Sequence, residues 1–571
     1  MNNDKAQKMR WFFRLLSAAG GVLLLLMLFG CQQEATPEPT PTVTPTPTAT
    51  PLPPEAPLPA HILARGYLVV GMRYDLPPFG YVTAEGDVAG FDVDLGRELA
   101  RRWLGDPQAV RFRQVRSDTA ADHVAAGDVD LTLTALLHTQ DVEHLVDFGP
   151  PLFVEGQALL VRAADAASIG APTDLGARPV AVVEGAEAEE ALWSALPYTP
   201  TLVTYPDFEQ ATAALARGEV DAVADMRRRL VRGMTTTPGT AIVAQYSHAV
   251  FAPAYAQDQP GLADLVDLTF QALFEDGTFD ALYARWFPGD SPPQREIWPG
   301  SATLSLEQAA SIAPAPDIVA SIQSRGRLRV GLVSRPPFAY LDETGTPAGY
   351  EVRLVQLMAG RWLGDETAVD FLPLSQADGL RMVGSGEVDM LIGGIAHTRP
   401  AALAVDFSLT TYVGGDGLLV LSGAAPAGLA GLEGQTVAAL VGSESANTLR
   451  RLAQEAGVNV TIVPRDTAEG AVASLLAGEV VAVVGERADL LGVAYATPGV
   501  DFTAERLTVT PLALALPPGR SNWRDLVDLT LQAMRYDGTL AAVYGYWFDD
   551  EPPAWYPWPG EPLQPLRIYG P

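Results

Sequence analysis

The chain carries the same long series of segments twice, about 260 residues apart, and this duplication restricts its possible folds more than any other feature. The run "GFDVDLGRELARRWLGD" at 90 is matched by "GYEVRLVQLMAGRWLGD" at 349. Near the end of each copy, "DLVDLTFQALFEDGTFDALYARWF" at 264 is matched by "DLVDLTLQAMRYDGTLAAVYGYWF" at 525, and "IWPG" at 297 by "PWPG" at 557. Because solenoid repeats have periods of about 20–50 residues, a period this long indicates a duplicated domain.

Each copy alternates β-rich runs with helical patterns. "YLVVGM" predicts a strand, "DVDLGRELARRWLG" a helix that ends at Gly105, and the last long run two helices broken at Asp276-Gly277. A second α/β half starts with "RPVAVVEG" in one copy and "QTVAALVG" in the other. The chain then returns to its first half through "AVFAPAY" or "PLALALP". We therefore expect two α/β lobes per copy, with mostly parallel sheets, joined by crossing strands.

Composition supports several folded units and excludes some partners. With 571 residues, 48% of them hydrophobic, the chain can bury several cores, about three or four folding units by typical domain size. Its 38 basic and 68 acidic residues give a formal net charge of -30. A chain this acidic repels nucleic acid and anionic lipid head groups, so we expect neither as a partner surface.

The N-terminus has the pattern of an export signal. Basic residues precede the apolar run "GGVLLLLMLFGC", which is too short to span a bilayer and ends at Cys31, the only cysteine. This pattern resembles a bacterial lipoprotein signal cut before Cys31, which would then carry the lipid; the alternatives are an ordinary signal peptide or a single anchor helix. The single cysteine excludes an intramolecular disulfide. The predicted organisation is a signal peptide (1–30), a Pro/Thr-rich linker (31–60), domain 1 (61–300), a linker (301–316), domain 2 (317–560) and a tail (561–571).

Several short motifs occur in the same order in both copies: "PPF" after the first strand, "GFDVDL" or its equivalent, "VDF", and a final "DGT" with "WF". In this order and spacing the chain resembles the polar-amino-acid type of bacterial extracellular solute-binding protein (family 3), over residues 61 to 290 and again 317 to 550. The resemblance implies two tandem periplasmic-binding-protein-like clamps, each of two α/β lobes joined by crossing strands. Such a clamp closes on a small solute and delivers it to a membrane transporter or reports it to a sensor.

The resemblance also shows which binding groups are missing. In the family, an arginine four residues before the Val of "VDF", and a Ser or Thr five residues earlier still, hold the carboxylate of the solute. The corresponding residues here are Val142 and Leu137 in the first copy, and Ala401 and Ala396 in the second. Neither copy has the expected carboxylate clamp.

Other positions keep suitable chemistry. The aromatic residue of "PPF" is retained in both copies, and an acid for the solute ammonium aligns with Glu486 and, allowing one gap, with Asp225. In the second copy Arg335 or Arg399 is a candidate for the missing cation; the alternative is that both are surface arginines. No catalytic residue, metal or cofactor is predicted. The candidate ligand-binding residues are Phe79, Thr139, Gln157, Asp225, Phe338, Arg335, Arg399, Ser443 and Glu486.

The repeated histidines and the repeated Trp-Pro segments can each be interpreted in structural or in functional terms. His138 and His397 precede matching threonines, and we favour a capping or hydrogen-bonding role over a metal site, because the second copy has no further ligand at metal spacing. The aromatic ends "REIWPG" and "AWYPWPGEPLQPLRIYG" are candidates for carbohydrate stacking. We instead expect each to wrap onto its own domain.

Three functions from different classes follow. The leading one is a solute-binding protein, lipid-anchored on the extracytoplasmic face of the cell membrane, that passes an amino-acid-like solute to the subunits of an ABC-type uptake transporter. The second is a sensory or docking receptor whose clamps have lost their solute. The third is an enzyme on the same scaffold, dehydratase-like or cell-wall lytic, with Glu187 and Glu444 as candidate acids. The sequence does not identify the ligand.

Overall fold

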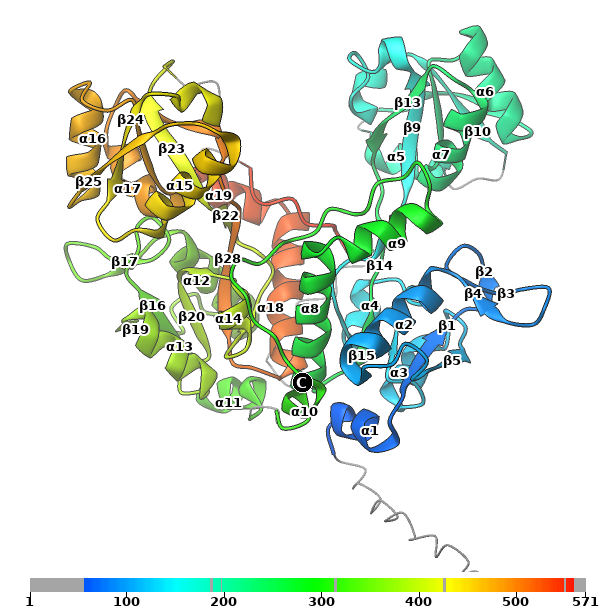
Figure 1. Cartoon of the computed structure of the whole chain (residues 1–571), viewed down its shortest axis with the longest axis horizontal. Helices are drawn as coiled ribbons and strands as arrows, with labels where there is room; N and C mark the ends of the chain where they lie inside the picture. Colours follow the sequence, from blue (N-terminus) through cyan, green and yellow to red (C-terminus); the bar gives the residue numbers. More distant parts are fainter. Residues whose placement is uncertain are drawn as a thin grey trace, which may run out of the picture. The chain divides into compact units, whose positions relative to one another are not determined.

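A computed structural model describes residues 56–184, 188–196, 198–312, 316–424, 428–548 and 551–558. The residues before 56 and after 558 lie outside this description, and with them the predicted lipidation site Cys31. Each copy contains two separate mixed sheets flanked by helices, which confirms the α/β class and the tandem clamps (Figure 1). We call the first sheet of each copy, with its helices, lobe A, and the second lobe B.

Lobe A of copy 1 has the strand order β5-β1-β6-β15-β7, and lobe A of copy 2 the equivalent order β19-β16-β20-β28-β21, with β22 also paired to β28. The first three strands of each sheet are parallel, but β15 and β28 run antiparallel to their neighbours, so the expected mostly parallel sheet is mixed. The antiparallel strand is the returning segment. The strands are β1 (Leu68–Met72), β5 (Val110–Gln114), β6 (Leu131–Thr132), β7 (Val146–Phe148), β15 (Ala254–Ala256), β16 (Leu328–Val333), β19 (Val369–Leu374), β20 (Met390–Ala396), β21 (Asp406–Phe407), β22 (Tyr412–Gly414) and β28 (Thr510–Leu516).

The helices of lobe A follow the apolar periodicity of the sequence. The helix α2 ends where Gly105 adopts a left-handed φ of 76°, which glycine tolerates without steric cost, as predicted. The final helices α8 and α9 are separated at Asp276-Gly277, also as predicted. The helices are α1 (Leu58–Arg65), α2 (Phe91–Leu104), α3 (Ala120–Ala125), α4 (Gln140–Glu143), α8 (Pro260–Glu275) and α9 (Thr278–Trp286) in copy 1, and α11 (Ile318–Arg325), α12 (Tyr350–Leu363), α13 (Gln376–Gly384), α14 (Arg399–Ala402), α18 (Ser521–Tyr536) and α19 (Thr539–Phe548) in copy 2.

Lobe B has the order β11-β10-β12-β9-β13 in copy 1 and β25-β24-β26-β23-β27 in copy 2. In each sheet one strand, β9 or β23, runs antiparallel to both of its neighbours, and the other two pairings are parallel. The elements are β9 (Gln157–Arg162), β10 (Pro179–Val183), α5 (Ala188–Ala195), β11 (Thr201–Tyr205), α6 (Phe208–Arg217), β12 (Ala222–Met226), α7 (Arg227–Thr236), β13 (Thr240–Gln245), β23 (Asp416–Leu421), β24 (Thr436–Leu440), α15 (Glu444–Ala456), β25 (Thr461–Arg465), α16 (Ala468–Leu476), β26 (Ala482–Glu486), α17 (Arg487–Ala496) and β27 (Val500–Arg506).

Two extended segments connect the lobes of each copy, as the sequence predicts. In copy 1 β8 pairs antiparallel with β14, and in copy 2 β22 pairs with β28 in the same way. The returning segments contain "AVF" and "PLALAL". The remaining short elements are β2 (Asp75–Leu76), β3 (Gly80–Val82), β4 (Val88–Ala89), β8 (Phe153–Glu155), β14 (Ala249–Phe251), β17 (Tyr340–Leu341), β18 (Pro347–Ala348), and 3₁₀ helices at Ala163–Asp165, Pro172–Leu175 and Leu429–Leu432.

Part of the predicted linker 301–316 belongs to copy 1. Its helix α10 (Leu306–Ala309) is capped by Ser305, whose hydroxyl accepts a hydrogen bond from the amide of Gln308. Leu306 and Ala309 are fully buried in the core of lobe A of copy 1. The stretch has no long apolar period from which these two contacts could be predicted. The prediction that all of residues 301–316 form a linker is corrected accordingly.

The Trp-Pro segments correct a second expectation. Trp555 packs on its own copy, where its indole N–H donates to the carbonyl of Thr410. Trp298 of copy 1, however, stacks on His397 of copy 2, and Trp558 of copy 2 stacks on His138 of copy 1. The prediction that each segment wraps only onto its own domain is therefore wrong.

Candidate functional site

The turn before α4 and α14 is where a family member would hold the solute carboxylate. Val142 and Ala401 pack into the hydrophobic cores beside these helices. Leu137 forms an antiparallel β-bridge with Phe251 on the returning strand. The four positions from which the clamp is missing are thus apolar in space as well as in sequence, and they offer no cation to a carboxylate.

The histidines of the two turns are stacked between aromatic rings. His138 lies between Phe148 and Trp558, with ring centroids 4.1 and 4.2 Å away, and its Nε2 is 2.5 Å from a carboxylate oxygen of Glu143. This contact confirms the hydrogen-bonding role for His138. Thr139 occupies the N-cap position of α4 without a side-chain cap bond.

His397 has the equivalent position in copy 2 without the carboxylate partner. Its ring lies 3.9 Å from that of Trp298 and 4.2 Å from that of Phe407. Burial lowers the pKa of His397 to about 3, so the ring is neutral at physiological pH. Thr398 caps α14 by accepting a hydrogen bond from the amide of Ala401. Among the residues with described positions, no group of three or more His, Cys, Asp or Glu is arranged to hold a metal ion.

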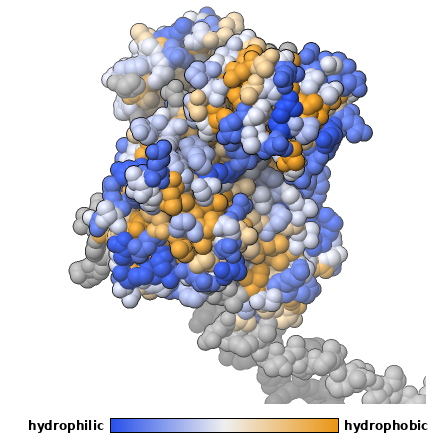
Figure 2. All heavy atoms as spheres, turned by 90° about the vertical axis from the view of Figure 1, so that its left-hand side faces the viewer, coloured by the Kyte–Doolittle hydropathy of each residue, from blue (hydrophilic) through white to orange (hydrophobic). Residues whose placement is uncertain are grey.

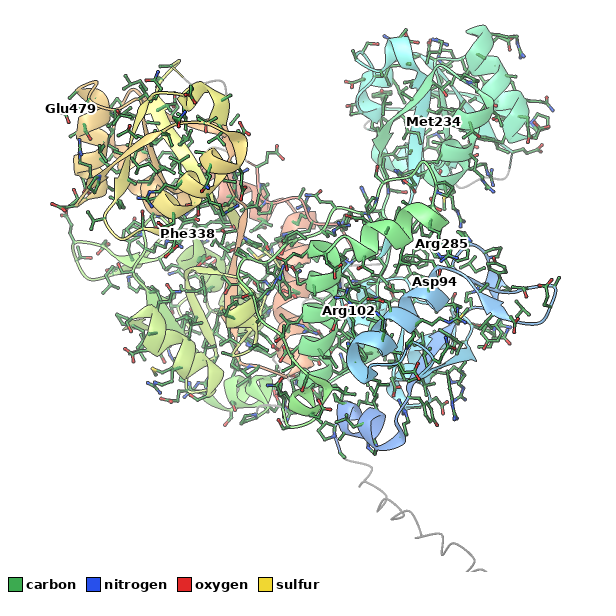
Figure 3. The ribbon with its side chains drawn as sticks, in the orientation of Figure 1. Asp94, Arg102, Met234, Arg285, Phe338 and Glu479 are labelled. Atoms are coloured by element: carbon green, nitrogen blue, oxygen red, sulfur yellow. The ribbon has the colours of Figure 1, made fainter. Side chains whose placement is uncertain are left out.

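The two "PPF" phenylalanines lie inside lobe A. Phe79 is 3% exposed and packs edge-on against Phe153 at 4.9 Å. Phe338, labelled in Figure 3, is fully buried and packs against Tyr412 at 5.1 Å. Each nevertheless has an arginine over its ring, Arg228 at 5.8 Å and Arg335 at 5.9 Å. The predicted solute contact for both rings stays a prediction.

Arg335 connects the two lobes of copy 2. It follows β16 in lobe A, and its Nε and Nη2 lie 2.7 and 2.6 Å from a carboxylate oxygen of Asp489, in α17 of lobe B. Its Nη1 donates to the carbonyl of Gly394 at 2.6 Å. The Arg335 side chain is 22% exposed and that of Asp489 51% exposed. The guanidinium is thus fixed at one end by lobe A, while its partner across the lobes remains open to solvent.

Glu486 lies beside this ion pair, at the end of β26. Its carboxylate accepts a hydrogen bond from the amide of Gly415 at 2.7 Å. Burial raises the pKa of the Glu486 carboxyl, and the Gly415 amide and the positive charge of Arg335 oppose that rise. Lobe B of copy 2 therefore brings two carboxyl groups, from Glu486 and Asp489, to the neighbourhood of one guanidinium.

Strand register corrects the assignment of Asp225. In β12, Met226 pairs with Gln157, just as Glu486 pairs with Asp416 in the other copy, so Met226 occupies the position equivalent to Glu486. Asp225 is one residue earlier and, because side chains alternate along a strand, it points to the other face of the sheet. It is 1% exposed and paired with Arg229 at 3.0 Å. The one-residue gap allowed in the sequence comparison put the acid on the wrong face.

The remaining candidates are held by internal contacts. Arg399 is 5% exposed and its Nη1 lies 2.5 Å from a carboxylate oxygen of Glu275 in copy 1, so the prediction that it supplies the solute cation is contradicted. Ser443 occupies the N-cap position of α15, and its hydroxyl donates to the carbonyl of Leu440. Gln157 is 3% exposed, and its backbone amide donates to the hydroxyl of Ser247 at 2.8 Å.

Sequence reasoning missed Asp489. A signal was present, because the two copies differ together at both ends of the contact: Arg335 and Asp489 in copy 2 correspond to Leu76 and Arg229 in copy 1. In copy 1 the nearby cation instead comes from lobe B, where Arg228 pairs with Glu155 at 3.1 Å. Comparing the copies for paired changes in charge would have pointed to this contact.

Two surface cavities lie away from these residues. One, of about 300 Å³, is between α16 and α17, and the other, of about 390 Å³, is between α12 and α19. In copy 1 the position equivalent to the second cavity contains an ion pair, because Asp94 on α2 meets Arg285 on α9 at 2.9 Å (Figure 3). On the side of copy 2 seen in Figure 2, apolar and hydrophilic side chains are interspersed. No helix within the described ranges is long and apolar enough to cross a membrane.

Comparison with known proteins identifies the fold and the class. The family model for bacterial extracellular solute-binding proteins, family 3, matches residues 68–289 and again 328–550. A glutamine-binding protein of an ABC transporter from Bacillus subtilis is 25% identical over 39% of this chain and 82% of its own length. A glutamine-binding protein from Geobacillus stearothermophilus is 28% identical over 38% of this chain and 81% of its own.

Solved structures match one copy at a time. The solute receptor for L-cysteine of Neisseria gonorrhoeae is 26% identical over 40% of this chain and 93% of its own, with a TM-score of 0.32. An ancestral cyclohexadienyl dehydratase is 25% identical over 41% of this chain and 97% of its own, with a TM-score of 0.35. The two curated relatives named above are both glutamine-binding proteins. The two matched ranges cover most of the sequence, and the chain therefore belongs to the bacterial extracellular solute-binding proteins of family 3, with two domains of that family in tandem.

Proposed function

We propose that the protein is a lipid-anchored, extracytoplasmic solute-binding protein that supplies an ABC-type uptake transporter, and that copy 2 binds the solute. The family membership and the amino-acid-binding relatives support solute binding. The basic and apolar N-terminus ending at Cys31 supports export and lipidation.

The contact between Arg335 and Asp489 is the observation that carries the assignment to copy 2. An amino-acid-like solute needs a cation for its carboxylate and a carboxylate for its ammonium, because a buried charge without a partner costs several kcal/mol. Arg335 is the cation, and Glu486 and Asp489 are the acids within its reach. A bound solute would exchange its own carboxylate for that of the exposed Asp489, and its ammonium would face Glu486.

Copy 1 lacks both parts of this arrangement. Leu76 stands at the position of Arg335, and Met226 at that of Glu486. This loss supports the second candidate function, a docking role, for copy 1 alone. Copy 1 would then position the chain on the transporter or on a sensor while copy 2 carries the solute.

An enzymatic role has less support. Glu187 lies outside the described residues. Glu444 is exposed at the start of α15 and accepts a hydrogen bond from the side chain of Asn447 at 3.3 Å. A carboxyl exposed in this way lacks the fixed geometry that general acid catalysis requires, so binding is the function that the residues support.

The test is a thermal-shift and calorimetry screen of the whole exported chain against amino acids, polyamines, small sugars and organic acids. A solute that carries a carboxylate should raise the melting temperature, since a ligand that binds only the folded state stabilises it. The variant Arg335→Leu, which introduces the residue of copy 1, should weaken that binding by about 30-fold or more, equivalent to about 2 kcal/mol.

Arg381→Leu is the matched control, because it removes an exposed arginine of the same copy that pairs with Glu387 at 3.1 Å. Its affinity for the solute should equal that of the wild type. If Arg335→Leu binds the same solute undiminished, the assignment of the cation is wrong; if no compound in the panel shifts either protein, the docking role gains the support instead.

A further inference from the structure

The segments that follow each copy's last helices cross to the opposite copy. We call residues 294–300 tail 1 and residues 551–558 tail 2. The indole of Trp298 in tail 1 lies 3.9 Å from the ring of His397, and that of Trp558 in tail 2 lies 4.2 Å from the ring of His138. The duplicated "WPG" motif thus makes the same contact twice, in opposite directions.

Each tail starts from an equivalent position on its own copy. In copy 1 the side-chain amide of Gln271 donates to the carbonyl of Glu296 and accepts from the amide of Trp298. In copy 2 the equivalent Gln532 donates to the carbonyl of Tyr556. Gln271 and Gln532 lie on α8 and α18, so each tail is fixed at the last long helix of its own copy before it crosses.

Backbone and side-chain hydrogen bonds hold the crossed ends. The amide of Arg399 donates to the carbonyl of Pro299 at 3.0 Å. In the opposite direction, the side-chain amide of Gln140 donates to the carbonyl of Trp558 at 3.0 Å. Gln140 and Arg399 are equivalent residues in the two His-Thr turns. The tails therefore meet equivalent turns through carbonyls at or next to the crossed tryptophan.

The start of α18 also contacts copy 1, at β7 and at the segment before α8. The side-chain amide of Gln257 donates to the carboxylate of Asp525, and the hydroxyl of Ser521 donates to that of Asp147, at 2.8 and 2.7 Å. Arg524 pairs with Asp147 at 3.1 Å. Because these contacts are independent of the tails, the two copies lie against each other along more than the crossed segments.

We propose that each tail completes the core of the opposite copy, so that the chain is a fused pair in which the copies stabilise each other through exchanged tryptophans. His138 is 8% exposed and His397 9% exposed with the tails in place. Without the tail, one face of each imidazole would meet water, and the stack of three rings would lose its outer member. Stacked aromatic side chains contribute more than their buried area alone, which makes the tryptophan the main contact of each tail.

Replacement of the two indoles tests the crossing directly. Trp558→Ala and Trp298→Ala keep the backbone carbonyl and amide groups of the tails, so only the stack is lost. Hydrogen exchange of the whole chain should become about tenfold faster in the α4 turn, residues 138–144, for Trp558→Ala. For Trp298→Ala the acceleration should instead occur in the α14 turn, residues 397–403, in each case on the copy that does not carry the mutation.

Trp555→Ala is the matched control within tail 2. Its indole N–H donates to Thr410 of copy 2 and its ring lies 5.7 Å from the guanidinium carbon of Arg535, so its effect should remain in copy 2. Trp558→Phe retains a stacking ring and should restore most of the protection, which covers the case in which Trp558→Ala folds poorly. Faster exchange in the mutated tryptophan's own copy, or unchanged exchange in the opposite turn, would overturn the proposal.

Discussion

A buried acidic side chain occupies the same position in both copies, but it accepts different hydrogen bonds in each. Asp92 and Glu351 both come two residues after the glycine that precedes the first long helix, and they are 1% and 0% exposed. The carboxylate of Asp92 accepts a hydrogen bond from the hydroxyl of Thr134 at 2.8 Å, and burial raises the pKa of Asp92 to about 7. Glu351 accepts from two amides, those of Gly393 and Gly394, at 2.7 and 2.9 Å.

The two acids should therefore respond differently to conversion to the amide. Asp92→Asn replaces a carboxyl whose pKa of about 7 keeps about half of it protonated at neutral pH, and it should change the free energy of unfolding by less than about 1 kcal/mol. In Glu351 one oxygen accepts from both amides and the other from the hydroxyl of Thr411, so Glu351→Gln replaces one of these two accepting oxygens with an NH2 donor, and it should cost about 2 kcal/mol. Thermal unfolding of both variants provides the measurement, and equal losses would contradict this account.

At the level of single residues, the sequence shows which groups of the carboxylate clamp are absent. It does not show which charged residues lie in the site instead. The apolar residues Val142 and Ala401 are identified by their distance from "VDF", because a short helix keeps its register. Asp489 is not, since its partner Arg335 is about 150 residues away and pairs with it only when both lobes have formed. The error at Asp225 has the same origin, because one residue in a strand changes the face of the sheet.

Secondary-structure elements are predicted well where the pattern is long. The helix α2 and the pair α8 and α9 have apolar residues at helical spacing and glycines at their ends, so their bounds follow from local chemistry. The strand β6 is only Leu131–Thr132, although the apolar run around it predicts a longer strand. Sheet direction is the other limit, because the antiparallel return of β15 and β28 depends on the second lobe.

The first and last long helices of each copy are connected by a buried hydrogen bond that the duplication has preserved. The indole N–H of Trp103 on α2 donates to the hydroxyl of Thr269 on α8, and that of Trp362 on α12 donates to Thr530 on α18, both at 2.9 Å. Both threonines are less than 9% exposed. A buried indole N–H without an acceptor would carry the full desolvation penalty of an unpaired donor.

Thr269→Val and Thr530→Val should each destabilise the protein by about 1–2 kcal/mol, since valine keeps the shape of threonine and removes the acceptor. Chemical denaturation of each variant measures the loss. Thr235→Val, on the exposed surface of α7, is the control and should have a much smaller effect. Unchanged stability in both buried variants would show that the indoles find other acceptors.

On the scale of the whole molecule, the copies meet around a single arginine with several acids. The residue equivalent to Arg524 in copy 1 is Ala263, so only one copy contributes an arginine here. The acids, in contrast, come from equivalent positions of both copies, such as Asp264 and Asp525. Burial raises the pKa of Asp264 to about 8, that of Asp267 and Asp528 to about 7, and that of Asp147 to about 6. The titratable groups around this point are Glu143, Asp147, Tyr255, Asp264, Asp267, Asp406, Arg524, Asp525 and Asp528.

These acids make the stability of the folded chain depend on pH in an unusual direction. In the unfolded chain they lose their protons near the ordinary value of 3.8, whereas in the folded chain their pKa values lie between about 6 for Asp147 and about 8 for Asp264. The folded state therefore binds more protons between these limits, and its stability falls as the pH rises from about 4 to about 8. The melting temperature should drop by about 5 °C or more from pH 5 to pH 8. Asp264→Asn, which is neutral throughout, should reduce that drop, while the exposed Asp118→Asn should leave it unchanged, because the hydrogen bond from Arg116 keeps the pKa of Asp118 below its usual value. A melting temperature that is constant or rises across this range would show that the acids are ionised in the folded protein and that water reaches them.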